Sequence, residues 1–158
     1  MKEIPLRNSD LVALVDDEDY EELSKYKWFV IYNNCMIYAV KSIGYGNRSM
    51  HSYLLSKKEG YVRDHKDGNG LNNQKDNLRY ATSSQNQFNR KKQNRPTSSK
   101  YKGVNFNKSN KNWYVRIAIN GKRICLGAFI NETNAALAYN EAARKYHGEY
   151  AKLNIIVT

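Results

Sequence analysis

The sequence has few of the residues that build disulfide-rich or zinc-bound modules. Its two cysteines, Cys35 and Cys125, lie far apart, and no four-ligand Cys/His set with the paired spacing of a zinc site is present. Isolated cysteines are typical of a reducing compartment, where thiols stay free. We therefore expect no zinc and an intracellular, cytoplasmic protein.

Long apolar stretches are also missing. No run approaches the roughly 18 residues that cross a bilayer, and no signal peptide opens the chain, so we expect a soluble protein with no membrane partner. Mean hydropathy is −0.81, and 13 tyrosines stand against 4 phenylalanines, a composition too polar for one large core. At 158 residues the chain suits two or three small modules with thin cores.

Acidic residues are scarce outside the N-terminal part. The net charge is +11 and the pI is about 9.6, which favours a polyanionic partner. Residues 1–50 hold six Lys and Arg against eight Asp and Glu, residues 51–95 hold ten against four, and residues 96–158 hold ten against three. The partner should therefore contact the middle and C-terminal parts and largely spare the first fifty residues.

A carboxylate stands beside an imidazole at Asp64 and His65, within the basic middle part of the chain. The Asp64 oxygens suit a hard cation such as Mg²⁺ or Mn²⁺, and His65 can take up a proton near neutral pH. The four residues 67–70, Asp-Gly-Asn-Gly, form a dense cluster of turn formers, and a short strand follows over 77–81. This order predicts a hairpin.

A helix is predicted directly after the hairpin. Thr82, Ser83 and Ser84 offer hydroxyls that cap its start, and the polar segment reaches about residue 92. Asn86 lies in the first turns of this predicted helix.

The whole stretch resembles a known family. The residues that carry the resemblance are Asp64-His65, Asp67-Gly68-Asn69-Gly70, Asn72-Asn73, Asp76-Asn77-Leu78-Arg79, Thr82, Gln85-Asn86 and Asn89. The pattern is similar to the HNH endonucleases of phages and introns, the homing type, in which a ββα-metal hairpin and helix grip one divalent ion against the scissile phosphate. Such an enzyme would act in the host cell of a phage or other mobile element.

The resemblance implies a role for each matching position. His65 would be the general base that activates water, and Asn77 would hydrogen-bond across the hairpin to hold the loop that bears the imidazole. Asp64 and Asn86 would hold one Mg²⁺ or Mn²⁺ ion. The last motif letter is Asn86 instead of His, and a neutral amide binds metal less tightly, so the ion should bind well only when DNA phosphate completes its ligands.

A lone Asp-His pair is common by chance and by itself indicates a surface turn. Here Asn77 follows His65 by twelve positions and Asn86 follows Asn77 by nine, with the turn cluster in the first interval. This spacing favours a catalytic site over a structural loop.

The first part of the chain, residues 1–56, predicts a small α+β scaffold for the hairpin. Strands are expected over 11–15, 28–32 and 36–41, the last two joined at Asn33-Asn34, and a helix is expected to start at the acidic residues 16–19. His51 lies in a short predicted helix over 49–55, where a role near DNA and a merely packed or capping role both stay open.

The predicted nuclease core covers residues 57–92, and a basic linker follows over 93–100. The stretch from Arg90 to Lys100 has no Leu, Val, Ile or aromatic residue, so it should be flexible. Such a linker can lie on phosphate without reading sequence, or it can be a solvated connection only.

The C-terminal part, residues 101–154, predicts three strands and a helix. The strands are expected over 101–106, 113–119 and 122–129, and Asn120-Gly121 is a strong hairpin signal between the last two. Asn131 can cap the helix, Gly148 can end it, and Ala135, Ala138 and Ala142 can share the face that packs on the sheet.

This part is similar to the Apetala/ethylene-response-factor DNA-binding domain. The residues that carry the similarity are Ser99-Lys100-Tyr101-Lys102-Gly103-Val104, Leu126-Gly127-Ala128-Phe129, Ala138-Tyr139-Asn140-Glu141-Ala142-Ala143 and Gly148-Glu149-Tyr150-Ala151-Lys152-Leu153-Asn154. In that family the three-stranded sheet lies in the major groove and the helix braces it. Ala118 and Cys125 depart from the plant pattern, so the plant target sequence is not expected here.

The resemblance and the basic linker together give a set of predicted DNA contacts. Arg and Asn suit guanine and adenine edges, and Lys suits phosphate or guanine. For Trp113, packing in the core is an equal alternative. The predicted contact residues are Arg90, Lys91, Lys92, Arg95, Lys100, Lys102, Asn105, Asn107, Trp113, Arg116 and Arg123.

The predicted fold is α+β: a ββα-metal HNH hairpin and helix with a small N-terminal α+β scaffold, and a C-terminal three-stranded antiparallel sheet packed on one helix. The predicted function is a metal-dependent endonuclease acting on double-stranded DNA, nicking once per monomer, with a homodimer needed only for a double-strand cut. The alternative is a DNA-binding transcriptional regulator that keeps the HNH fold as a scaffold and does not cleave. RNA is a weaker partner, because its deep, narrow major groove does not admit a sheet.

Overall fold

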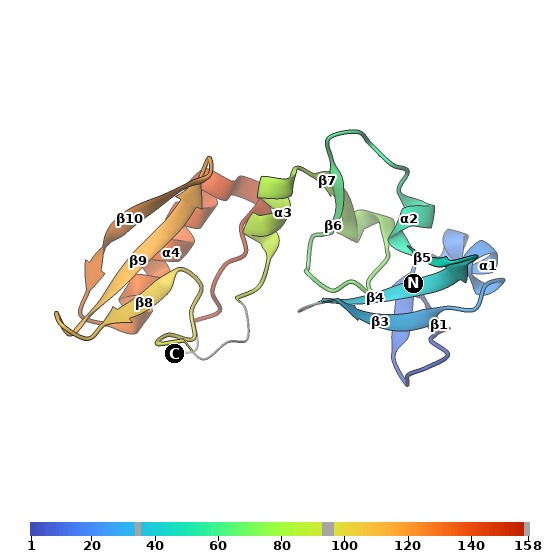
Figure 1. Cartoon of the computed structure of the whole chain (residues 1–158), viewed down its shortest axis with the longest axis horizontal. Helices are drawn as coiled ribbons and strands as arrows, with labels where there is room; N and C mark the ends of the chain where they lie inside the picture. The colour runs from blue at the N-terminus through green and yellow to red at the C-terminus, as the bar shows by residue number, and fades with distance from the viewer. Residues whose placement is uncertain (34–35, 93–96, 157–158) are drawn as a thin grey trace. The chain divides into compact units, whose positions relative to one another are not determined.

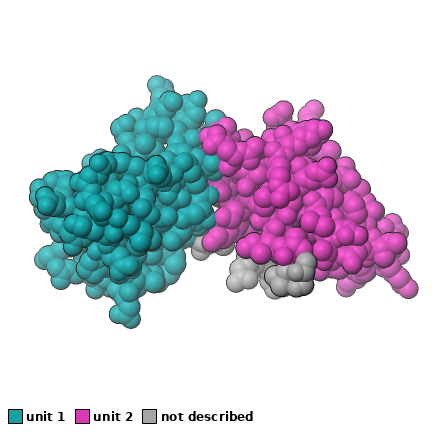
Figure 2. Space-filling view, turned by 180° about the vertical axis from the view of Figure 1, so that it is seen from behind, with its two compact units in different colours: residues 1–83 teal, residues 84–158 magenta. Residues whose placement is uncertain are grey.

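The computed structural model describes residues 1–33, 36–92 and 97–156. The chain divides into two compact units, residues 1–83 (unit 1) and residues 84–158 (unit 2), coloured separately in Figure 2. Short helices and several antiparallel sheets make up the chain, which confirms the α+β class. None of the helices in the described ranges is long and apolar enough to cross a membrane.

Unit 1 is built from short antiparallel strands (Figure 1). β1 pairs with β2, and β6 pairs with β7. The strands β3, β4 and β5 form one sheet in that order. The turn predicted at Asn33-Asn34 lies partly outside the described residues. The elements are β1 (Lys2–Pro5), β2 (Val12–Val15), α1 (Asp17–Ser24), β3 (Phe29–Asn33), β4 (Met36–Ile43), β5 (Gly46–Ser49), α2 (His51–Leu54), β6 (Val62–His65), the 3-10 turn η1 (Lys75–Asn77) and β7 (Leu78–Ala81).

One hydrophobic core joins the parts of unit 1. Trp28 is fully buried at its centre and donates its indole N–H to the Leu23 carbonyl oxygen at 2.8 Å. Leu71, from the hairpin loop between β6 and β7 (residues 66–77), is buried in the same core. The core therefore continues across the boundary predicted after residue 56. Its buried members are Ile4, Leu6, Ala13, Val15, Leu23, Trp28, Val30, Ala39, Met50 and Leu71.

Main-chain hydrogen bonds attach the hairpin loop to β2. The Leu14 N–H donates to the Leu71 carbonyl at 2.8 Å, and the Asn73 N–H donates to the Leu14 carbonyl at 2.8 Å. The Asp16 carboxylate, just before α1, accepts from the Lys75 N–H at 2.8 Å. The acidic residue that precedes α1 therefore binds the loop.

Unit 2 begins with α3 and continues into a sheet covered by one long helix. The three strands are antiparallel in the order β10-β9-β8, and Figure 1 shows α4 lying along one face of them. The elements are α3 (Ser83–Asn89), whose first residue precedes the unit boundary, β8 (Val104–Asn107), β9 (Asn112–Ile119), β10 (Lys122–Phe129), α4 (Glu132–His147) and the 3-10 turn η2 (Gly148–Tyr150).

Local sequence signals account for the limits of these elements. Asn120 and Gly121 have φ angles of 49° and 76°, as a tight turn between β9 and β10 requires. The Asn131 side chain caps α4 by accepting from the Thr133 N–H at 2.6 Å, and Gly148 follows its last turn with φ 55°.

The buried face of α4 differs from the predicted one. Ala135, Ala136 and Tyr139 are buried against the sheet, together with Ala142 and Ala143, whereas Ala138 is only half-buried. Tyr139 belongs to this core, so the buried stripe includes an aromatic ring beside the alanines.

Part of the predicted linker belongs to unit 2. Residues 93–96, including Arg95, lie outside the described residues. Ser99 is buried and donates its hydroxyl to the Glu132 carboxylate at 2.6 Å, and the Ser98 hydroxyl accepts from the Phe106 N–H at 2.9 Å. These hydrogen bonds hold residues 98–100 on the C-terminal fold, although the stretch has no Leu, Val, Ile or aromatic side chain to pack there.

Candidate functional site

The hairpin of β6 and β7 presents the Asp-His pair at the end of a strand. Asp64 lies opposite Arg79 in the antiparallel register, and His65 lies opposite Leu78. Both Asp64 and His65 are buried, with 6% and 2% of their surfaces exposed. Asp64 and His65 are therefore buried at the end of β6, where the hairpin loop begins.

Asn77 holds the two ends of the hairpin loop together. Its amide nitrogen donates to Asp67 Oδ1 at 3.0 Å and to the Asn72 carbonyl at 2.8 Å, and its Oδ1 accepts from the Asp67 N–H at 3.1 Å. The Lys66 N–H donates to the Asn77 carbonyl at 2.9 Å. These bonds fix the chain directly after His65.

Asp67 is the acceptor at the centre of the loop. Burial alone would raise the pKa of Asp67, but hydrogen bonds from the Asn69 N–H and from the Asn72 and Asn77 side chains lower it below its ordinary value. Asp67 therefore stays ionised and keeps the loop closed around it.

Gly70 lets the loop approach β4 closely. A Cβ atom on Gly70 would lie 2.2 Å from the Ile37 carbonyl oxygen and 2.8 Å from Tyr38 Cδ1. The backbone of the loop therefore rests directly on β4, at a position that only glycine fits.

The His65 imidazole is held at one nitrogen by Asn73. His65 Nε2 lies 3.4 Å from Asn73 Oδ1, and Asn73 is fully buried. The amide of Asn73 is oriented by its own bond, because its nitrogen donates to the Leu71 carbonyl at 3.1 Å. Burial lowers the pKa of His65, while the Asn73 hydrogen bond and the charges of Asp67 and Asp64 raise it, and the net direction is downward.

Two more rings surround this imidazole. The His51 ring lies edge-to-face with the His65 ring, with centroids 5.1 Å apart, and the Tyr38 ring lies 6.0 Å from His65 and 5.6 Å from His51. Burial, followed by the charges of His65 and Arg63, lowers the pKa of His51 to about 3. His51 is therefore a neutral ring at physiological pH.

Asp64 forms a buried ion pair. Arg79 Nε lies 2.9 Å from Asp64 Oδ2, and both side chains are almost fully buried. Carboxylate and amide oxygens are ligands that Mg²⁺ and Mn²⁺ accept, so Asp64 and Asn86 fit such an ion in their chemistry. Within residues 1–33, 36–92 and 97–156, however, no group of three His, Cys, Asp or Glu could hold a metal ion.

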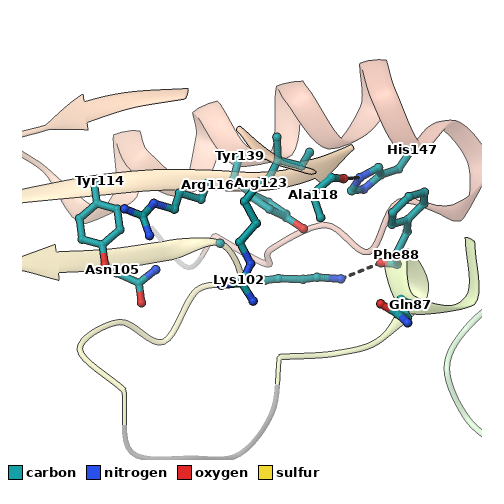
Figure 3. Close-up of a pocket in the computed structure, with 12 residues that line it drawn as sticks. Gln87, Phe88, Lys102, Asn105, Tyr114, Arg116, Ala118, Arg123, Tyr139 and His147 are labelled. Atoms are coloured by element: carbon teal, nitrogen blue, oxygen red, sulfur yellow. Dashed lines mark hydrogen bonds between the residues drawn. The ribbon is translucent and has the colours of Figure 1, made fainter. Parts of the chain in front are cut away.

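Asn86 lies on α3, which is bound firmly within unit 2. The Phe88 ring stacks on the His147 ring, with centroids 3.7 Å apart and an angle of 5° between the planes. Lys102 Nζ donates to the Phe88 carbonyl at 2.6 Å, near the C-terminal end of the helix (Figure 3). It also donates to the Arg90 carbonyl at 2.7 Å. Burial lowers the pKa of Lys102 to about 8, with the charge of Lys152 adding to the effect.

The outer face of the unit 2 sheet carries polar and cationic side chains. Val115 and Ile117 are buried beneath α4, so strand alternation turns Tyr114 and Arg116 outward, and the Arg116 guanidinium lies 4.7 Å from the Tyr114 ring centroid. These side chains line a pocket of about 540 Å³ together with Asn105, Arg123 and residues of α3 (Figure 3).

The predicted DNA contacts divide according to their surroundings. Arg116 and Arg123 are exposed on the outer face, and Asn105 lies beside Tyr114 in the register. Arg90, Lys91 and Lys100 are exposed outside the sheet.

Other predicted contacts have structural partners. Trp113 points to the α4 side, where it packs on the core and on Phe106 with ring centroids 4.8 Å apart, in keeping with the packing alternative. Lys92 donates to the Ser99 and Tyr101 carbonyls, and Asn107 accepts from the Ser109 N–H at 3.0 Å. Lys92, Asn107 and Lys102 therefore form hydrogen bonds within unit 2.

The sequence did not predict that Asn73, Tyr38 and Arg79 contact the Asp-His pair. Asn73 and Arg79 stand in the motif, but their partners depend on the loop path and on strand register. Opposite charges facing each other across a hairpin would have identified Arg79 once Asp64 and Arg79 were paired. Tyr38 comes from β4, far away in sequence, and no local pattern points to it.

The HNH endonuclease family model matches residues 57–88. An uncharacterized HNH endonuclease of Acanthamoeba polyphaga mimivirus is 33% identical over 157 residues, which cover 95% of this chain and 78% of the viral protein. An AP2-like ethylene-responsive transcription factor of Arabidopsis thaliana is 38% identical over 63 residues, which cover 40% of this chain and 13% of the plant protein. No solved structure matches the chain. Because the viral similarity extends over nearly the whole sequence and includes the hairpin, this chain belongs to the HNH endonuclease family.

Proposed function

We propose that this protein is a homing-type endonuclease that hydrolyses a phosphodiester bond of duplex DNA, with one divalent metal ion and with His65 as general base. The observation that carries the proposal is the surroundings of His65: a neutral imidazole, fixed by a buried amide, follows a carboxylate in the hairpin that the family model covers. The net charge of +11 supports DNA as the substrate.

The hydrogen bond from His65 to Asn73 indicates which ring nitrogen of His65 would act as the base. Because Asn73 directs its Oδ1 to the ring, His65 carries its proton on Nε2 and donates there. The lone pair is then on Nδ1, which accepts the proton of the attacking water. The lowered pKa of His65 supports the same role, because the ring is unprotonated and ready to accept at neutral pH.

HNH nucleases generally use a divalent metal. In this chain Asp64 and Asn86 would hold Mg²⁺ or Mn²⁺, which would stabilise negative charge on the phosphate and on the leaving 3′ oxygen. Arg79 pairs with Asp64 Oδ2 and would balance the negative charge on that oxygen.

Unit 2 would bring the duplex to the site. Asn105, Arg116 and Arg123 on the outer sheet face would contact base edges and phosphates in the major groove, and the exposed Arg90, Lys91 and Lys100 would add phosphate contacts. The similarity of 63 residues of this chain to a plant transcription factor supports a DNA-binding role.

The test is cleavage of supercoiled plasmid in the presence of Mg²⁺ or Mn²⁺, with duplex binding measured by gel shift. The wild-type chain should produce nicked circles, and His65→Ala should bind DNA equally but leave the plasmid intact. One catalytic site per chain predicts a nick per binding event and a double-strand cut only where two chains meet. Undiminished nicking by His65→Ala would remove His65 as the base.

A non-cleaving DNA-binding regulator is the second candidate function. The observation that favours it is the burial of the site, since His65 is 2% exposed and the Asp64 carboxylate pairs with Arg79. Tight binding to duplex with no nicked product under either metal would support this candidate and overturn the first.

A further inference from the structure

His51 contacts the proposed general base directly. Its ring meets the His65 ring at an angle of 84°, with centroids 5.1 Å apart, which is the edge-to-face arrangement that aromatic rings favour. Tyr38 lies against both rings, at 5.6 Å from His51 and 6.0 Å from His65. The contact therefore restricts the plane of the His65 imidazole, while Asn73 restricts one of its nitrogens.

His51 is itself anchored to the sheet of unit 1. Its Nε2 lies 3.0 Å from the Ser49 hydroxyl, and Ser49 ends β5, opposite Val40 of β4. The Met50 N–H donates to the Ala39 carbonyl at 2.8 Å, just before His51 begins α2. Because Tyr38, Val40 and Ala39 belong to the same strand, β4 supports both rings that touch His65.

The neutral state of His51 suits a role in packing. A charged ring beside His65 would repel the imidazolium that forms when His65 accepts a proton. Burial keeps His51 uncharged throughout the physiological range, so it adds no such repulsion.

We propose that His51 is a positioning residue for His65: its ring, anchored by Ser49, holds the catalytic imidazole in the orientation that proton transfer requires. This inference rests on the proposed role of His65 as general base. His51 touches neither water nor phosphate in this role, and it acts only through the neighbouring ring.

The expected effect follows from the loss of this contact. His51→Ala leaves a space beside His65, so the catalytic ring can turn or shift, and a misplacement of about 1 Å can lower a rate about 100-fold. We expect the turnover number for nicking to fall between about 10-fold and about 100-fold, with DNA affinity unchanged. His51→Phe keeps a ring in the same place and should retain turnover within about fivefold, because edge-to-face packing survives without the Ser49 bond.

Two measurements separate positioning from general stability. Leu23→Ala removes a buried side chain from the core of unit 1, and Leu23 is not among the rings around His65, so this variant should lose stability and keep turnover at a temperature where it is folded. Nuclear magnetic resonance of the imidazole groups provides a second measurement, since the chain has three histidines to assign. His51→Ala should move the His65 ring signals, and His51→Phe should move them less.

The outcomes are distinct. Full turnover by His51→Ala, an equal loss in His51→Ala and His51→Phe, or an equal loss in Leu23→Ala would overturn the positioning role while leaving His65 as base. Nicking by His65→Ala would instead overturn the proposed function itself. Lower turnover in His51→Ala, near-normal turnover in His51→Phe and a changed His65 signal would support the inference.

Discussion

Replacing Gly70 with alanine tests how closely the hairpin loop supports the site. The added Cβ would lie 2.2 Å from the Ile37 carbonyl oxygen and 2.8 Å from the Tyr38 ring. Non-bonded heavy atoms are ordinarily about 3.5 Å apart, so the loop and β4 must separate by roughly 1 Å. The Ile37 oxygen is main chain in a paired strand, which leaves the loop as the part that moves.

The size of the effect can be worked out from these contacts. Extra volume in a packed site costs about 1–3 kcal/mol of unfolding free energy. The loop also carries Asn73, which contacts His65, and Tyr38 lies against the same ring. A displacement of about 1 Å at this point should lower the turnover number about 100-fold, more than the stability loss alone would cause.

Gly46→Ala is the matched control. Gly46 also lies in unit 1, its φ angle is ordinary, and an added Cβ would find its nearest atom, the Ile43 carbonyl oxygen, at 4.0 Å. Urea denaturation and plasmid nicking should place Gly46→Ala within about 0.5 kcal/mol of the wild type, with normal turnover. The reasoning is refuted when Gly70→Ala is as stable and active as the wild type, or when both variants lose equally.

Four further predictions concern the loop, unit 2 and the metal. Asn77→Ala should lower the unfolding free energy by about 1–2 kcal/mol in urea denaturation, since the Asp67 and Asn72 bonds that close the loop are lost; an unchanged midpoint would contradict this. Burial lowers the pKa of Lys102 to about 8 from 10.5, so the unfolded chain holds this proton to higher pH than the folded chain. The stability of the wild type relative to Lys102→Met should therefore rise between about pH 8 and about pH 10.5. A pH-independent difference in urea midpoints would contradict this prediction. Removal of divalent metal with a chelator should stop nicking and leave DNA affinity in the gel shift intact. Arg116→Ala should lower DNA affinity and reduce the salt dependence of binding by a slope of about 1, whereas Trp113→Phe should leave that slope unchanged.

Elements with local signals were predictable from the sequence. Asn120-Gly121 specified the β9–β10 turn because both positions accept positive φ, and Asn131 marked the start of α4 because its side chain can accept from the first turn. The motif spacing from Asp64 to Asn77 predicted the hairpin, since turn formers fill the interval between two short strands.

Features that depend on distant partners were not predictable. β1 (Lys2–Pro5) and β5 (Gly46–Ser49) are polar, charged or proline-containing segments that become strands only because β2 and β4 offer them edges. The burial of Leu71 and the contact of Tyr38 with His65 likewise depend on how the hairpin packs on strands that are not its neighbours in sequence. The face of Trp113 required the strand register, which alternation alone left open.

The insertion of Leu71 into the N-terminal core has a practical consequence for engineering. A cassette limited to the segment that the family model covers, residues 57–88, would leave Leu71 without its apolar neighbours and Lys75 without Asp16. Anyone grafting this hairpin onto a different protein should therefore transplant the N-terminal elements of unit 1 together with it, and should also keep α3, which carries the proposed metal ligand Asn86.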